Sequence, residues 1–566
     1  MKNIKSYSAI LLLLTLCIIA CKDSFLDVAP TGTLSSVELS SKEGLDGALI
    51  GAYSMLLGRA GFYSDATNWM WGSVLGGDAN KGSSEGDQAV INEVQAFAVQ
   101  SNNNAVLEKY SVLYEGIARA NATLRLLATA QENVSEADKI RIQGEARFLR
   151  GHYYFELKRS FNNTPYLDEQ WDEVTPVPND QELWPFIEAD FQFAFEHLPG
   201  TQIAPGRANK WAAGAYLAKA YLYQNKFSEA KAIFDLVITK GTTAGGTPYG
   251  LVPYYGDVFR SIKDNNEGSV FAVQAAAGTG SIFNANPALV LNFPFGSGAP
   301  GGCCGFFQPS LDLANSFRTT AAGLPLLDHS YNDSINALKT DLGLTSTDDF
   351  TPDTGNLDPR LDHAIGRRGI PYLDWGPHPG ASWIRSQAYG GPYSPKKFSY
   401  YQSGSGVEND VSSWTPGYTA VNYNIIRFAD VLLLAAEAEI ELNNLDKALE
   451  YINRVRIRAM NSALPDADAN YVINTYNSFS SQAEARTAVR FERKLELSGE
   501  GHRFYDLVRW GLAEQVLNAY LQHERQFLSP PFLGAQFIAG KNEYLPIPQN
   551  EIDLQGEDVL IQNPGY

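Results

Sequence analysis

The stretch that decides the fold is Ile142-Gln-Gly-Glu-Ala-Arg-Phe-Leu-Arg150, followed by Tyr153-Tyr-Phe-Glu-Leu157. Its apolar positions recur at steps of 4, 3, 4 and 4, at Ile142, Ala146, Leu149, Tyr153 and Leu157. This spacing is that of one helix face. The sequence therefore predicts a long helix here, with one side packed against other elements.

The predicted helix spans residues 135–161. Ser135 and Asp138 resemble a capping box at its start. A preceding helix is predicted over 114–130, where Ile117, Ala120 and Leu124 lie on one face.

Paired helices are predicted over residues 210–240 and again over 428–458. In the first pair Asn225-Lys226 makes the turn, and in the second Asn443-Asn444 does so. Small alanines at the expected crossing points, such as Ala218 and Ala436, are typical of tetratricopeptide repeats. Such repeats indicate a scaffold and say nothing about a ligand.

The middle of the chain, residues 241–424, is rich in Gly, Pro, Asn and Tyr. A stretch of this length without long helices is expected to fold over a scaffold or to carry function. The predicted fold is mainly α, a tetratricopeptide-like helical-repeat scaffold with a large, irregular, loop-rich lobe. The predicted segments are 1–20 (signal peptide), 21–240 (helical), 241–424 (irregular) and 425–566 (helical).

The N-terminus predicts export. Lys2 and Lys5 precede an apolar run from Ala9 to Ala20, which as a helix would span about 18 Å against a hydrocarbon core of about 30 Å. It is too short for a membrane span and typical of a signal peptide. Ile18-Ile-Ala-Cys21 resembles a bacterial lipobox, which predicts a lipid on Cys21; cleavage of an ordinary signal near position 20 is the alternative.

Composition narrows the class of protein. The formal charge of −19 argues against nucleic acid as a partner. Aromatic residues make up 12% of the chain, which suits either sugar binding or a large packed core. Cys303 and Cys304 are expected to be two small side chains in a Gly-rich loop, with a vicinal disulfide as the alternative.

The sequence contains no convincing catalytic, cofactor or metal motif, and we expect none of these functions. Glu496 and Glu500 are one helical turn apart, yet nearby Arg493, Arg503 and Arg509 favour structural ion pairs over acid–base catalysis. Ion pairs of the same kind are expected for Arg427 with Asp430 and for Arg147 with Glu145. A structural calcium among Asp348, Asp349, Asp353 and Asp358 is the weaker alternative to a solvated acidic loop.

Four segments resemble the SusD/RagB family of outer-membrane nutrient-binding lipoproteins. They are the 142–157 stretch, Arg427-Phe-Ala-Asp-Val-Leu-Leu-Leu434, the run from Phe491 to Trp510, and the tail from Tyr544 to Tyr566. The resemblance implies a binding protein, not an enzyme, anchored in the outer membrane through its lipid. It also implies that the chain captures a glycan and delivers it to a TonB-dependent SusC-like transporter. A peptide ligand, or a ligand-free adaptor of surface complexes, remains an alternative.

Candidate ligand-binding residues are aromatic and planar polar side chains outside the helix patterns, because sugars need ring faces and hydrogen-bonding groups. They fall in three clusters: Trp69, Trp71, Asp78 and Asn80; Phe306 and Phe307; and Trp375, Trp383 and Trp414, beside Tyr372 and Arg385. The resemblance supports Asp78, since family members often carry an Asp in this early segment near the ligand site.

Overall fold

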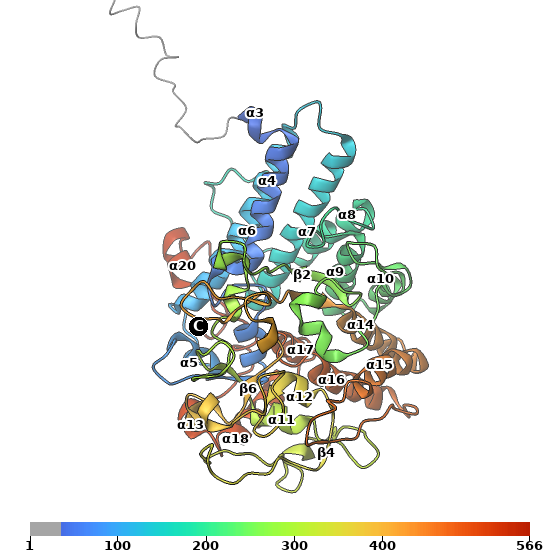
Figure 1. Cartoon of the computed structure of the whole chain (residues 1–566). Helices are drawn as coiled ribbons and strands as arrows, with labels where there is room; N and C mark the ends of the chain where they lie inside the picture. Colours follow the sequence, from blue (N-terminus) through green and yellow to red (C-terminus); the bar gives the residue numbers. More distant parts are fainter. Residues whose placement is uncertain (1–35) are drawn as a thin grey trace, which may run out of the picture.

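The computed structural model describes residues 36–566 (Figure 1). The predicted signal peptide, 1–20, and the predicted lipid attachment site, Cys21, lie outside the described residues. Within 36–566 no helix is both long and apolar enough to cross a membrane.

Long helices near the N-terminus form one end of the molecule (Figure 1). They are α4 (Lys42–Tyr53), α6 (Asn104–Ala128) and α7 (Glu136–Phe161), with short α3 (Ser36–Leu39) and α5 (Val90–Gln95) before and between them. The predicted helix at 135–161 is confirmed: Ser135 is the N-cap of α7, and its side chain accepts a hydrogen bond from the backbone N–H of Asp138. The preceding helix, α6, begins ten residues earlier than the predicted 114–130 because Asn103 caps it.

The paired helices are confirmed. They are α9 (Lys210–Tyr223) with α10 (Phe227–Lys240), and α14 (Phe428–Glu441) with α15 (Leu445–Met460). The helix α8 (Trp184–His197) joins α7 to α9, and α10 packs on α14, so the helices form a continuous stack. Asn225 and Asn443 adopt positive φ in the turns, a conformation that Asn tolerates better than most residues.

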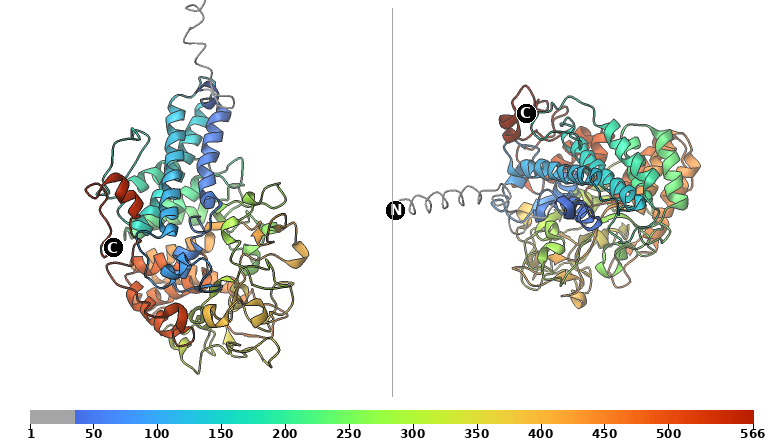
Figure 2. Two further views of the ribbon diagram at one scale, coloured as in Figure 1. Left: turned by 90° about the vertical axis from the view of Figure 1, so that its left-hand side faces the viewer. Right: turned by 90° about the horizontal axis from the view of Figure 1, so that it is seen from above.

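Residues 241–427 form the lobe, which contains short helices and strands without a central sheet. Its α-helices have at most six residues and are α11 (Leu311–Ser316), α12 (Leu361–Ala364) and α13 (Gln387–Gly390). The strands make two-stranded sheets: β1 (Ala79–Gly82) with β3 (Phe306–Pro309), β2 (Ser269–Val273) with β9 (Tyr423–Arg427), β4 (Asn356–Leu357) with β10 (Asn470–Tyr471), β5 (Ile365–Gly366) with β6 (Ser394–Pro395), and β7 (Asn409–Asp410) with β8 (Tyr418–Thr419). Only the β4–β10 pair is parallel. The left view of Figure 2 shows the lobe's loops beside the helical stack.

The C-terminal helices connect the lobe to the stack. They are α16 (Gln482–Glu496), α17 (Arg503–Arg509), α18 (Ala513–Glu524), α19 (Ser529–Phe532) and α20 (Gln549–Gln555). Between α16 and α17 the chain turns at Gly501, whose φ is 73°. A side chain on Gly72 would collide with the backbone of Gly501, so this turn packs directly on the π-helix η2 (Trp69–Val74).

Buried charges hold this joint together. Glu496 is fully buried and contacts Arg360 of the lobe (3.0 Å), Arg427 (2.5 Å) and Arg458. Glu500 accepts hydrogen bonds from Arg427 (2.7 Å) and Lys397 (2.6 Å). Because these partners come from the lobe, including its last strand β9, and from α15, the ion pairs join the lobe, α15 and the turn after α16.

The charged residues predicted to form structural ion pairs do form them in the described part of the chain, with the exception of Arg503, but most of the predicted partners are wrong. Arg493 and Arg509 do bind Asp506, whereas Arg503 makes no ion pair within residues 36–566. Asp430 pairs with Lys219 and Arg493 and not with Arg427. Arg147 binds Asp190, while Glu145 binds Arg141 and Arg207. Arg509 with Asp506 and Arg141 with Glu145 are neighbours within one helix, whereas the other pairs join different elements.

Candidate functional site

An open cleft lies in the lobe between two tyrosines, Tyr254 and Tyr401. Its walls come from the segments 254–260, 371–374 and 396–401 and from Leu464, Pro465 and Asp466, which follow α15. The empty space, including the part open to solvent, is about 750 Å³. Both tyrosine rings are half-buried, and neither hydroxyl makes a hydrogen bond to another described residue.

The walls of the cleft are fixed by contacts within the lobe. The Arg260 guanidinium lies 3.9 Å from the centre of the Tyr401 ring, and its Nη2 donates to Glu408 at 3.0 Å. The Asp374 carboxylate accepts backbone hydrogen bonds from Gln402 (2.5 Å) and Ser403 (2.9 Å). The Tyr401 ring is therefore held in place before any ligand arrives.

The polar groups at the base of the cleft are committed to the protein. Lys397 binds Glu500, and burial lowers the pKa of this lysine to about 8. Lys396 donates to the carbonyl of Pro371 at 2.7 Å, and burial lowers its pKa to about 8 as well. His363 Nε2 lies 2.7 Å from the Ser462 carbonyl, and burial lowers the pKa of the ring to about 4. The hydrogen-bonding groups of the cleft that the protein does not use therefore include the Tyr254 and Tyr401 hydroxyls, beside the two tyrosine rings.

A series of hydrogen bonds through Tyr400, Gly301 and Thr415 links the cleft segment to the residue next to Trp414. Trp375 donates through Nε1 to the carbonyl of Tyr400 (2.9 Å), and the Tyr400 hydroxyl accepts from the backbone N–H of Gly301 (3.0 Å). Thr415 donates to the carbonyl of Gly301 (2.6 Å), and the neighbouring Trp414 is 60% exposed. We call Tyr254, Tyr401, Trp375 and Trp414 the aromatic loop surface. Of the three predicted clusters, only Trp375 and Trp414 belong to it.

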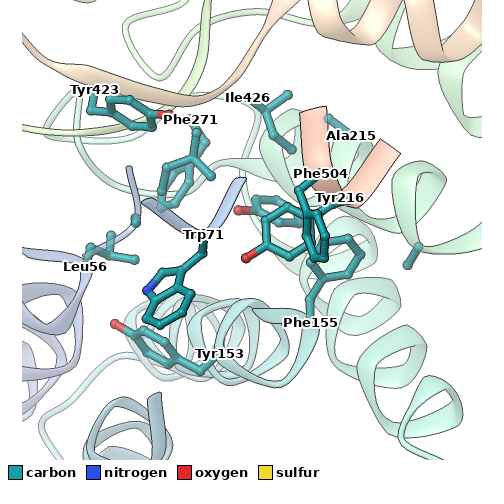
Figure 3. Close-up of a cluster of buried hydrophobic side chains, with 14 of the residues drawn as sticks. Leu56, Trp71, Tyr153, Phe155, Ala215, Tyr216, Phe271, Tyr423, Ile426 and Phe504 are labelled. Atoms are coloured by element: carbon teal, nitrogen blue, oxygen red, sulfur yellow. The ribbon is translucent and has the colours of Figure 1, made fainter. Parts of the chain in front are cut away.

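The expectation that Trp69 and Trp71 face solvent is wrong. They are only 2% and 1% exposed, and their indole N–H groups donate to the carbonyls of Phe62 (2.8 Å) and Tyr63 (2.5 Å). Figure 3 shows the Trp71 indole among buried side chains, with Leu56 and Tyr153 near it. The Asn68–Trp71 segment is not a loop but the start of a π-helix that the turn at Gly501 covers.

Asp78 and Asn80 are also buried. Asp78 accepts a hydrogen bond from the backbone N–H of Gly499 (2.9 Å), and burial raises its pKa to about 6. Asn80 accepts from the Tyr520 hydroxyl (2.9 Å) and donates to the carbonyl of Gly390 (3.2 Å). Both side chains tie the early segment to the C-terminal part of the chain.

The remaining candidates are buried as well. Phe306 and Phe307 lie in β3, where the Phe307 ring packs edge-on against Trp69 at 5.7 Å. Trp383 is buried against Tyr372 at 5.6 Å. Phe306 and Phe307 are part of the main core, and Trp383 is part of a small core in the lobe, so the prediction that they contact a ligand is not supported by their position.

One further expectation is corrected. Cys303 and Cys304 form a disulfide, against the expectation of two separate side chains. Of the four acidic residues named as a weaker calcium alternative, Asp353 binds Arg318 at 2.8 Å and Asp358 binds Arg360 at 2.7 Å. Within 36–566 no group of three or more His, Cys, Asp or Glu side chains is arranged to hold a metal.

The ion pairs also bear on catalysis. Burial alone would raise the pKa of Glu496, but Arg458, Arg427 and Arg360 outweigh it and hold that pKa well below its ordinary value. Glu500 is similarly lowered by Arg427 and Lys397 against the effect of burial. Two buried, ionised carboxylates bound to cations are unsuited to general acid catalysis.

Sequence reasoning missed Tyr254, Arg260 and Tyr401. The available signal was the pair of Tyr-Tyr dipeptides, Tyr254-Tyr255 and Tyr400-Tyr401, in irregular chain. In each pair one ring is buried and the other is only half-buried.

A helical stack that carries a loop lobe with partly exposed rings defines a binding protein built on tetratricopeptide-like helices. Comparison with known proteins identifies the class further. Residues 267–566 match the model of the SusD family, and residues 24–222 match a model described as "Starch-binding associating with outer membrane". The chain belongs to the SusD family.

The similarity to known relatives extends over nearly the whole chain. The SusD-like protein P2 of Formosa agariphila is 25% identical over 99% of this chain and all of its own length. Surface glycan-binding protein A from Bacteroides fluxus superposes with a TM-score of 0.67 at 22% identity, covering 93% of this chain and 99% of that protein. The Bacteroides thetaiotaomicron protein of that name, solved with laminarihexaose, gives a TM-score of 0.64 at 19% identity, covering 92% and 99%. These structures are similar to this chain in fold.

Proposed function

We propose that this chain is a lipid-anchored outer-membrane protein that captures an oligosaccharide at the aromatic loop surface and delivers it to a TonB-dependent SusC-like transporter. It binds the glycan without transforming it. Membership of the SusD family supports the general role, and the lipobox at Cys21 supports the anchor.

The observation that carries the proposal is the pre-positioned ring of Tyr401 in an open cleft. Glycan binding needs ring faces for the C–H faces of the sugar and hydrogen-bonding groups for its hydroxyls. The cleft supplies the Tyr254 and Tyr401 rings with free hydroxyls, and Trp414, outside the cleft, is a further exposed ring of the lobe. Because Arg260 and Asp374 already hold the Tyr401 segment, little conformational entropy is lost when a sugar binds.

Native affinity electrophoresis tests the binding. The purified mature chain would be run in gels containing laminarin, starch, xylan or galactomannan, and we expect at least one of these to retard it. Tyr401→Ala and Trp414→Ala should each weaken the retardation about tenfold, the equivalent of about 1.4 kcal/mol. Phe527→Ala is the matched control, since Phe527 is a 50% exposed ring three residues after α18, outside the cleft.

Each part of the proposal has its own contrary result. If no gel retards the chain, the glycan-binding role is wrong. If the two variants and the control are all retarded like the unaltered chain, the site is elsewhere. Delivery is tested by purifying the lipidated chain from membranes, and absence of a co-purifying barrel transporter would contradict it.

A further inference from the structure

A second groove lies on the helical stack, outside the lobe. Its floor is α6, through Tyr110 and Tyr114; one wall is the loop 165–177, and the other is α20. It encloses about 1260 Å³ of empty space, including the part open to solvent. Figure 1 shows α20 beside the lower part of α6. We call it the α6–α20 groove.

Both walls of the groove expose apolar side chains. Val174 is 79% exposed and Leu554 is 80% exposed, and the half-buried Trp171 ring lines the same space. Adjacent exposed apolar groups on opposite walls mark a binding surface more often than isolated ones do.

The floor and the loop wall are rigid. Tyr114 donates to the carbonyl of Pro165 (2.7 Å) and Asn121 to that of Leu167 (3.0 Å), which fixes the start of the loop on α6. Trp171 donates through Nε1 to the carbonyl of Thr175 (2.8 Å), so its polar edge is satisfied within the loop. Asp172 accepts from the backbone N–H groups of Val174 (3.1 Å) and Thr175 (2.8 Å) and closes the turn.

The groove also contains hydrogen-bonding groups that the protein does not use. Within residues 36–566 the side chains of Ser111, Glu551 and Gln555 make no hydrogen bond or ion pair. The other acidic groups of the rim are paired, Glu115 with Arg59 and Arg119, and Glu173 with Arg125. What remains is an indole ring, a hydroxyl, an amide and one unpaired carboxylate.

We infer that the α6–α20 groove is a second glycan-binding site that takes an uncharged stretch of polysaccharide. A ring beside free planar hydrogen-bonding groups is the combination that sugar hydroxyls and C–H faces need. The free Glu551 carboxylate repels uronates and sulfated sugars, which leaves neutral residues as the ligand. The inference rests on the proposed function only in taking a glycan as the ligand, because the groove shares no residue with the aromatic loop surface.

Hydrogen-exchange mass spectrometry of the mature chain locates the contacts. The probe is whichever of laminarin, starch, xylan or galactomannan retards the chain most strongly. We expect slower exchange in the segments 165–177 and 549–555 as well as in the segments around Tyr254 and Tyr401. Protection of the lobe alone overturns the second site and leaves the proposed function intact. No protection anywhere contradicts both.

Variants separate the two sites further. In a Tyr401→Ala/Trp414→Ala background, the groove should retain measurable retardation, and adding Trp171→Ala should reduce it about tenfold. Phe527→Ala in the same background is the control and should change nothing. If Trp171→Ala has no effect there, the groove does not bind the glycan. Oligomeric state is measured in parallel, because loss of a dimer in Trp171→Ala would show that the groove binds a second copy of the chain instead.

Discussion

Replacing Glu496 by Gln tests whether the buried charges hold the lobe to the helical stack. The substitution keeps the size and removes one negative charge from three arginines, Arg360, Arg427 and Arg458. Glu496 is 0% exposed, so water cannot replace the lost charge. Breaking a buried ion pair from one side costs about 3–5 kcal/mol.

The expected change in melting temperature follows from the size of the chain. At about 2.1 cal/mol/K per residue, unfolding of the whole chain has an entropy of about 1.1 kcal/mol/K, so a loss of about 4 kcal/mol lowers Tm by about 3–4 °C. If the lobe unfolds as a separate unit, its entropy is smaller and the shift is larger. Differential scanning calorimetry measures both the shift and the number of transitions.

Glu450→Gln is the matched control. It removes the same charge from an exposed i,i+3 pair with Lys447 on α15, which contributes at most about 1 kcal/mol. If Glu496→Gln shifts Tm no more than this control does, the buried network is not what joins the lobe to the stack. Glu496 binds Arg427, which in turn shares Glu500 with Lys397 at the base of the cleft. Glu496→Gln should therefore also weaken glycan binding, whereas Glu450→Gln should not.

Three further predictions follow from burial and charge. Trp71→Ala should destabilise the chain by about 3–5 kcal/mol through the cavity it leaves, which is measured as a lower Tm. Glycan affinity measured well below that Tm should stay unchanged. A loss of affinity without a loss of stability would show that Trp71 contacts the ligand. Burial raises the folded-state pKa of Asp78 to about 6, so ionisation of Asp78 destabilises the folded chain as pH rises above the pKa of the unfolded state. Asp78→Asn cannot ionise and should therefore gain stability relative to the unaltered chain as pH rises from about 4 to 6. A difference in Tm between the two proteins that does not change with pH would contradict this. The whole chain should lose stability as pH falls from about 4.5 toward 2. Burial raises the pKa values of Asp312 and Asp506, but Lys494 beside Asp312, and Arg493 and Arg509 beside Asp506, lower them further, to about 2 in the folded state. A Tm that stays constant across this pH range at constant ionic strength would refute the prediction.

The helical stack could be predicted from sequence because its determinants are local. The steps of three and four residues from Ile142 to Leu157, and the Ser135 cap, depend only on neighbours within one helix. The same holds for the turns at Asn225 and Asn443. The first ten residues of α6 could have been predicted in the same way, because Val106, Tyr110 and Leu113 continue the steps of four and three to Ile117 and Asn103 caps their start.

Ion-pair partners could not be predicted because they are not local. Glu496 and Glu500 lie near three arginines in the sequence but do not bind them. Glu496 binds Arg360, Arg427 and Arg458, which are between 38 and 136 residues away in the sequence. Glu500 binds Lys397 and Arg427, which are more than 70 residues away. A buried charge takes the partner that the packed elements bring to it, because desolvation makes an unpaired charge far more costly than an unusual partner.

The tryptophans show why the binding surface is harder to predict than the scaffold. A lobe of short strands and loops has no amphipathic helix to supply its core, so it must bury rings from the loops themselves, as Trp383 does against Tyr372. An aromatic residue beside glycines therefore marks a small core as readily as a site, and Trp383 is of the first kind. What distinguishes Tyr401 is that its neighbour Tyr400 is buried and bonded to Gly301, so the chain direction turns the next ring outward. Exposure in such a lobe is set by contacts between segments about a hundred residues apart, and these contacts exist only in the folded chain.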